Sequence, residues 1–305
     1  MTFDIVALGE PLYELNQQPD GRFLGGFGGD TSNVAIAGAR LGARAAYVTR
    51  LGGDMFGEAI ARLWRDEAVD AGAVVVDPDA PTGLYFVTHD DAGHHFTYRR
   101  KGSAASLMTP ADVPAALIAS ARFLHVSGIS QAISATAAAS VDHAIALAGQ
   151  AKVKVSFDTN YRAKLWSPQA AWMAAARAAA SAHILKTSIE DSAALVGAKT
   201  PADIAGRFLD LGSEIVLVTL GAEGVHVATG AGSETIRGRR VAAVDATGAG
   251  DAFTGALLAE LARGVELHSA VCFANAAAAL STLGFGAIAP LPRRAEVERF
   301  LLGDR

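Results

Sequence analysis

The sequence has little cysteine, little charge and no long apolar run, and each shortage excludes a class of protein. A single cysteine, Cys272, in 305 residues excludes a disulfide framework and any cysteine-based zinc site. No apolar run reaches the roughly 18 residues that a membrane span requires, and the first ten residues have neither the basic region nor the apolar core of a signal peptide. The net charge of −5 argues against nucleic-acid and anionic-membrane partners. We therefore expect a cytoplasmic protein that binds neither nucleic acid nor membrane.

Hydrophobic residues make up 51% of the chain, which is enough for a large core. Along the chain, short apolar runs typical of strands alternate with longer alanine-rich stretches typical of helices. Short apolar runs predict strands at Ile5–Leu8, Ala46–Arg50, Val74–Val76, Phe123–Val126, Val153–Phe157, His183–Leu185 and Ile215–Val218. Alanine-rich stretches predict helices at Asn33–Leu41, Phe56–Ala68, Ala135–Ala148, Pro168–Ala180, Ile189–Leu195, Ala202–Leu211, Ala252–Arg263, Leu267–Leu283 and Arg294–Leu302. This alternation predicts a single α/β domain over residues 1–305, with a doubly wound, mainly parallel sheet flanked by helices.

Two segments interrupt the alternation and have the pattern of hairpins. The segment Tyr13–Gly26 is polar around Pro19-Asp20-Gly21. In the segment Thr82–Arg100, apolar and polar residues alternate on both sides of Asp90-Asp91-Ala92-Gly93, which is a strong hairpin signal. We expect these insertions, at about residues 12–27 and 82–104, to form one small antiparallel β lid beside the main sheet.

Glycine is the residue in excess, with 32 in the chain, and the sharpest cluster lies at residues 245–253. The cluster follows a strand-like run, Arg240–Val244, and opens an apolar helix. The backbone N–H groups of Gly248, Ala249 and Gly250 would form an anion cradle at that helix N-terminus. Asp251 would then be either an ordinary N-cap or a general base for a substrate hydroxyl. The lysine of a P-loop is missing from this cluster.

The segment Asp245-Ala-Thr-Gly-Ala-Gly-Asp251-Ala-Phe resembles a signature of the ribokinase-like (PfkB-type) carbohydrate kinases. A second cluster, from Gly25 to Ala35, resembles their other signature, and the similarity extends over about residues 4–302. The resemblance implies that Asp251 is the catalytic base beside the cradle of Gly248, Ala249 and Gly250. It also implies that Gly28, Gly29 and Asn33 contact the sugar.

Within this family the finer resemblance is to the 2-keto-3-deoxygluconate kinases. The segments Tyr98–Ala104 and Phe157–Trp166 are the more specific marks. They imply a sugar acid held by Tyr85, Tyr98, Arg100 and Arg162, since a planar guanidinium binds both oxygens of a carboxylate. The alternatives are surface ion pairs for the arginines and ordinary packing for the tyrosines.

The resemblance further implies ATP and Mg²⁺ as cofactors. Residues expected to contact the nucleotide are Ser188, Thr219, Gly221, Gly224 and Asn275, although Asn275 could equally serve helix packing. Asp191, with Glu190 next to it, would organise Mg²⁺ through water.

The implied activity is ATP-dependent phosphorylation of the hydroxymethyl group of a sugar acid, with 2-keto-3-deoxygluconate as the leading candidate. A fructokinase or another sugar kinase of the family is the alternative, and a non-catalytic sugar or nucleotide sensor is the second. We also expect a homo-oligomer formed through the β lid. Stereochemical strictness, the position phosphorylated and any monovalent-cation dependence stay open.

Overall fold

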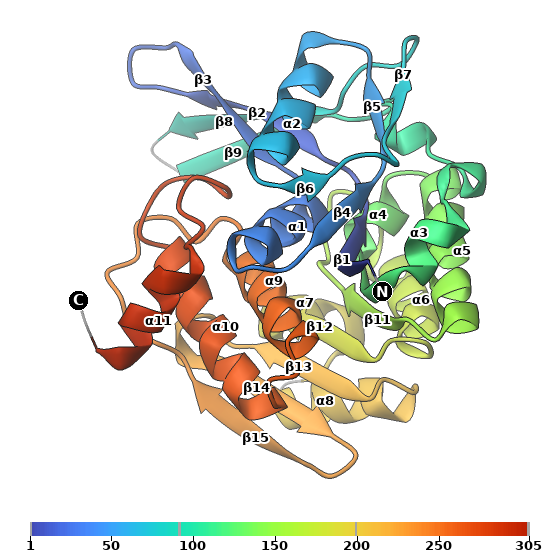
Figure 1. The fold of residues 1–305 in the computed structure, drawn as a ribbon. Coiled ribbons are helices and arrows are strands. Elements are labelled where there is room, and N and C mark those ends of the chain that lie inside the picture. Colours follow the sequence, from blue (N-terminus) through green and yellow to red (C-terminus); the bar gives the residue numbers. More distant parts are fainter. Residues whose placement is uncertain (1, 91–92, 199, 304–305) are drawn as a thin grey trace.

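A computed structural model describes residues 2–90, 93–198 and 200–303, and within these ranges nine strands form one large sheet (Figure 1). Its order is β15-β14-β13-β12-β11-β10-β1-β4-β6, and every pair from β13 to β6 is parallel. The strands are β1 (Phe3–Leu8), β4 (Ala45–Val48), β6 (Val69–Asp70), β10 (Ala121–Ser127), β11 (Lys154–Asp158), β12 (Ile184–Ser188), β13 (Ile215–Thr219), β14 (Gly224–Thr229) and β15 (Gly232–Arg237). The predicted doubly wound, mainly parallel α/β sheet is confirmed.

Helices cover both faces of this sheet. One face carries α3 (Ala115–Ala119), α4 (Gly128–Ala132), α5 (Ala135–Ala151), α6 (Pro168–Ala179), α7 (Ile189–Val196) and α8 (Pro201–Asp210). The other carries α1 (Asp30–Arg40), α9 (Ala249–Ala262), α10 (Leu267–Ser281) and α11 (Arg294–Leu302), with α2 (Met55–Asp66) at the β4–β6 edge. Short 3₁₀ turns are η1 (Ala105–Leu107), η2 (Pro110–Asp112) and η3 (Gly221–Glu223).

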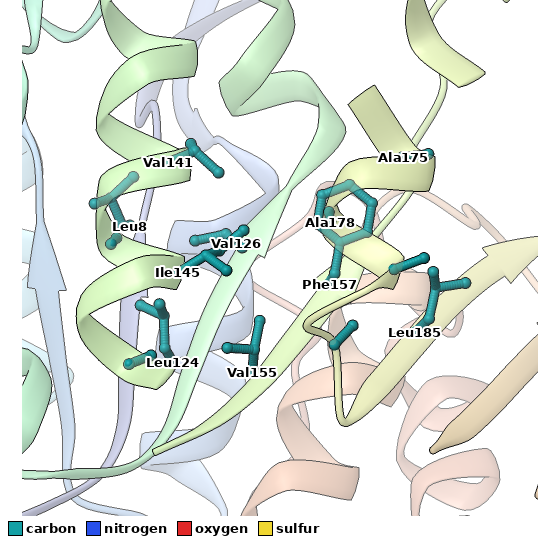
Figure 2. Packing of buried hydrophobic residues seen from close by; sticks show 14 of the residues in the cluster. Leu8, Leu124, Val126, Val141, Ile145, Val155, Phe157, Ala175, Ala178 and Leu185 are labelled. Atoms are coloured by element: carbon teal, nitrogen blue, oxygen red, sulfur yellow. The ribbon is translucent and has the colours of Figure 1, made fainter. Parts of the chain in front are cut away.

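The core between the sheet and its helices consists of side chains that are almost fully buried. On one face, Phe157 of β11 lies beside Ala175 and Ala178 of α6, where small residues leave room for the ring (Figure 2). On the other face α1 and α9 approach closely, because a Cβ at Gly255 would lie 2.6 Å from the Ala37 Cβ. This close approach fixes the relative position of two helix N-termini, and both belong to the site described below.

The edges of the sheet differ from the sequence prediction in several places, and the short edge strand β6 was not predicted. The β14–β15 hairpin was not predicted, and it adds two antiparallel strands beyond β13. The predicted strand Arg240–Val244 is irregular, because its Val244 N–H bonds to the Thr282 carbonyl at the end of α10 instead of to a strand. The predicted strand Ala46–Arg50 divides into β4 and β5 (Arg50–Gly52), and β5 pairs with β7 (Val75–Asp77) outside the main sheet.

A second, smaller sheet stands beside the main domain, with the order β3-β2-β8-β9. Its strands are β2 (Leu12–Gln17), β3 (Phe23–Gly28), β8 (Leu84–Asp90) and β9 (Gly93–Arg99). Both predicted hairpins are present, but their inner strands β2 and β8 pair in parallel, since a long crossover through the main domain separates them. The turn residues Asp91 and Ala92 lie outside the described residues. In the described ranges, none of the helices combines the length and the hydrophobicity needed to cross a membrane.

Candidate active site

A cavity of about 670 Å³ lies between the small sheet and the carboxyl ends of several main-sheet strands. Ligands bind at this edge in open α/β sheets, because the strand ends and helix N-termini converge there. The predicted site residues that line the cavity are Gly28, Gly29, Asn33, Tyr85, Tyr98, Arg100, Arg162, Ser188, Asp191, Thr219, Gly248, Gly250 and Asp251. The structure therefore brings together residues from distant parts of the chain.

Five predicted site residues do not line this cavity, namely Ala249, Glu190, Gly221, Gly224 and Asn275. The Asn275 side chain donates hydrogen bonds to the carbonyls of Ile236 and Arg237, which matches the packing alternative. A Cβ at Gly224 would lie 2.1 Å from the Ile236 carbonyl oxygen, so this glycine is required by the β14–β15 hairpin.

The N-terminus of α9 opens into the cavity. Gly248 is the N-cap, with φ of 76°, and a Cβ there would lie 3.0 Å from the Ala287 Cβ. The Ala249 N–H donates to the Ala246 carbonyl, whereas the described residues offer no acceptor for the N–H groups of Gly248 and Gly250. Those two groups, at the positive end of the helix, can bind an anion.

Asp251 lies in the first turn of α9, and the N-cap alternative is wrong because Gly248 takes that position. One Asp251 carboxylate oxygen accepts a hydrogen bond of 2.8 Å from Nδ2 of Asn33. Asn33 and Asp251 each lie one turn before the close contact of Ala37 with Gly255, so the packing of α1 on α9 aligns them.

The pKa of Asp251 is raised to about 7. Burial is the main cause, followed by the negative charge of Asp30, while the Asn33 hydrogen bond and the Lys186 charge act in the opposite direction. A carboxyl group with this pKa can exchange a proton near neutral pH.

Lys186 is a cavity residue that the sequence prediction gave no role. Its ammonium forms a 2.7 Å ion pair with Asp158, and both residues are buried. Burial acts to lower the pKa of Lys186, but the charge and hydrogen bond of Asp158 raise it above its usual value. A Cβ at Gly250 would lie 3.2 Å from Lys186 Nζ, which places a positive charge beside the N-terminus of α9.

The two predicted arginines have different surroundings. Arg100 forms an ion pair with Glu10, whose side chain is buried and also accepts a 3.2 Å hydrogen bond from Ser103. Arg162 is exposed at the cavity and pairs with no carboxylate in the described part of the chain. The guanidinium of Arg162 is therefore the more available of the two for an anionic ligand.

The oxygen donors suit a Mg²⁺ ion that is held mainly by a nucleotide. No three His, Cys, Asp or Glu side chains within residues 2–90, 93–198 and 200–303 are grouped to bind a metal alone. Asp191 lines the cavity. Burial, followed by the negative charge of Asp158, raises the pKa of Asp191, and a nearby cation would lower that pKa again. Mg²⁺ keeps several waters and needs few carboxylates. Of the two predicted carboxylates, only Asp191 lies in the cavity, while Glu190 is exposed.

Three further acidic residues lie at the site, namely Glu10, Asp30 and Asp158, and the sequence prediction did not include them among the site residues. Asp30 opens α1 and accepts a 2.8 Å hydrogen bond from Asn160, which has a strained φ of 35°. Their position could have identified two of them, because Asp158 is the last residue of the apolar strand β11 and Glu10 closely follows the apolar strand β1.

Comparison with known proteins matches residues 3–294 to the family model described as pfkB family carbohydrate kinase. The chain belongs to the pfkB family of carbohydrate kinases. The resemblance noted in the sequence is thereby confirmed, and the protein is a carbohydrate kinase. It is 38% identical to the 2-dehydro-3-deoxygluconokinase of Thermoproteus tenax, over 96% of this chain and 93% of that protein.

Two solved structures that are similar to this chain contain ligands. Fructokinase from Vibrio cholerae O395, solved with fructose, ADP and calcium ion, has a TM-score of 0.89 and 32% identity over 99% of this chain and 100% of its own. An E. coli protein assigned as Ribokinase II, solved with ATP and Mg²⁺, has a TM-score of 0.90 and 25% identity over 98% of this chain and 99% of its own. The fold thus accommodates a nucleotide, a divalent cation and a sugar in these proteins.

Proposed function

We propose that this pfkB-family kinase transfers the γ-phosphoryl group of ATP to the hydroxymethyl group of a sugar acid, with 2-keto-3-deoxygluconate as the substrate. The observation that carries the choice of an acid is the exposed Arg162 at the cavity, whose guanidinium donates a 2.8 Å hydrogen bond to the Tyr161 carbonyl and forms no ion pair within the described residues. The deeper cations Arg100 and Lys186 already have carboxylate partners. A neutral sugar has no anionic group that could form an ion pair with this guanidinium.

In the proposed mechanism, the Asp251 carboxylate accepts the proton of the sugar hydroxyl. The oxygen of that hydroxyl forms a bond to the γ-phosphorus as the bond from the γ-phosphorus to ADP breaks and ADP leaves. The N–H groups of Gly248 and Gly250, with the Lys186 ammonium, stabilise the negative charge on the transferring group. Mg²⁺, when bound, neutralises charge on the ATP phosphates, and Asp191 is the residue proposed to position its waters. Closure of the small sheet over the sugar would exclude water from the reaction.

A coupled ATP-consumption assay over 2-keto-3-deoxygluconate, fructose and ribose tests the substrate. We expect kcat/KM for the keto-deoxy acid to exceed that for fructose by about 10- to 150-fold, because a charge-assisted pair at Arg162 contributes roughly 1.5–3 kcal/mol. Phosphorylation of fructose alone would replace the proposal by the fructokinase alternative, which the fructose-bound relative supports. No phosphorylation of any sugar would favour the sensor.

The variant Arg162→Ala is the control for that assay. It is expected to lower kcat/KM for the acid by about 10- to 150-fold and to leave any activity on fructose nearly unchanged, since only the carboxylate loses its partner. Arg177→Ala, on the exposed side of α6, serves as the matched arginine control. An equal loss on both sugars would contradict the assignment of Arg162 to the carboxylate.

The pH dependence of kcat/KM is expected to follow the ionisation of Asp251. Its carboxylate is the active form, so kcat/KM should fall about tenfold per pH unit below an apparent pKa near 7 and level off above it. Measured initial rates from pH 5 to 9 check this. A flat profile down to pH 5 would show that no group with a pKa near 7 limits the reaction.

A further inference from the structure

One row of side chains crosses the whole small sheet on the face that meets the cavity. Glu14 of β2 is the register partner of Gly26 in β3 and of Tyr85 in β8, and Tyr85 is the partner of Tyr98 in β9. Tyr85 and Tyr98 line the cavity, with their rings stacked 5.8 Å apart. Glu14 therefore lies directly behind a tyrosine that faces the ligand site.

Glu14 is a buried carboxylate, with 8% of its surface exposed. One oxygen accepts the hydrogen bond of the Tyr85 hydroxyl, and the other accepts a 3.2 Å bond from Asn16 Nδ2. Among the described residues it forms no ion pair with any cation. A Cβ on the neighbouring Gly26 would lie 3.3 Å from its Oε1, so a side chain at that position of β3 would crowd the carboxylate.

Burying a carboxylate without a counter-ion costs stability, and a packing role would be filled more cheaply by an apolar residue. The particular property of a carboxylate is that it accepts hydrogen bonds and donates none. The Tyr85 hydroxyl has one proton, and this proton is directed to Glu14. Burial and then the Glu14 charge raise the pKa of Tyr85, so the hydroxyl keeps its proton in neutral solution.

We propose that Glu14 is a positioning residue that makes the Tyr85 hydroxyl an acceptor toward the ligand, so that Tyr85 binds a substrate hydroxyl and does not bind a carboxylate. This inference rests on the proposed function, because it orients the same sugar acid. At the Tyr85 hydroxyl itself, a substrate carboxylate would meet lone pairs and the nearby Glu14 charge. The acid end of the substrate is therefore directed to Arg162, and its hydroxyl groups face the small sheet.

The variant Glu14→Gln tests the inference, because it keeps the shape of the side chain and can donate to Tyr85 as well as accept. We expect the KM for the sugar to rise about tenfold, the loss of roughly one hydrogen bond, while the KM for ATP stays the same. Asp20→Asn, at the exposed tip of the same hairpin, is the matched control and should change neither KM. An unchanged sugar KM in Glu14→Gln would overturn the inference.

A double-variant cycle separates positioning from a general structural effect. If Glu14 acts through Tyr85, Glu14→Gln should add nothing to the sugar KM once Tyr85→Phe is present. Additive effects would mean that Glu14 acts independently of Tyr85, which also overturns the inference. If Glu14→Gln does not fold, Tyr85→Phe alone carries the test, and an unchanged sugar KM there refutes the hydroxyl contact.

The test is independent of which sugar proves to be the substrate. The KM is measured with whichever sugar the wild-type enzyme phosphorylates, fructose included. A wild-type enzyme that prefers fructose would therefore refute the proposed substrate, but the Glu14–Tyr85 double-variant cycle could still be interpreted. Additive effects in that cycle, measured with the sugar acid as substrate, would refute only the role of Glu14.

Discussion

Replacing Asp251 by Asn is expected to lower kcat about a thousandfold, the scale on which a positioned general base contributes. The amide cannot take up the proton of the attacking hydroxyl. The variant keeps the size of the side chain, and the hydrogen bond that Asn33 donates to position 251 can be retained by the amide oxygen. Binding of ATP and sugar, measured by calorimetry, should therefore change far less than turnover.

The stability of this variant supplies its own control. The pKa of Asp251 is above its ordinary value, so the folded state loses stability as pH rises toward and through about 7, when this carboxyl group ionises. Asn has no such ionisation, so at pH 8 the variant should unfold at the same temperature as the wild type or higher. Asp210→Asn, on the exposed end of α8, is the matched surface control. Turnover near that of the wild type in Asp251→Asn would exclude Asp251 as the base.

The glycine clusters could be located from the sequence because their demands are local. Gly29 has φ of 105°, and a Cβ there would lie 2.4 Å from the Glu10 carbonyl oxygen. Gly248 adopts a left-handed conformation at the start of α9. Backbone geometry of this kind requires glycine at one particular position, so the position can be identified from a single sequence.

The polar pairs of the site could not be predicted in the same way, because their members are far apart in sequence. Glu10 and Arg100 are separated by 90 residues, and Asn33 and Asp251 by 218. Nothing within a short window identifies such partners. Arg100 is therefore predicted from its local motif to bind the ligand carboxylate, whereas in the folded chain it forms an ion pair with Glu10.

The missed β14–β15 hairpin has a different cause. Its second strand, β15, lies at the edge of the sheet and exposes all of its residues except Ile236. An edge strand with one buried side chain carries almost no hydrophobic periodicity. The apolar run Arg240–Val244, by contrast, has the composition of a strand but bonds to the end of α10. Most of this run is also exposed, Val244 to 50%, so here the apolar composition predicted neither burial nor strand pairing.

Replacing Lys186 by Met is the second change with a large expected effect. In the described part of the chain, Lys186 is the only cation that forms an ion pair with the buried Asp158. Without Lys186 the Asp158 carboxylate has no counter-ion, and a buried charge without a counter-ion lowers the free energy of unfolding by about 3–5 kcal/mol. Thermal unfolding should shift downward by roughly 5–10 °C. Turnover should fall as well, since the ammonium that lies beside Gly250 is lost.

A second variant separates the two consequences of this change. Adding Asp158→Asn to Lys186→Met removes the uncompensated charge, so most of the lost thermal stability should return, because neutral groups of similar shape can replace a buried ion pair. Turnover should stay low in the double variant, since the missing positive charge at the N-terminus of α9 is not restored. Recovery of both stability and turnover would mean that Lys186 only neutralises Asp158. Recovery of neither would mean that Asp158 has a role in the site that does not depend on its lysine partner.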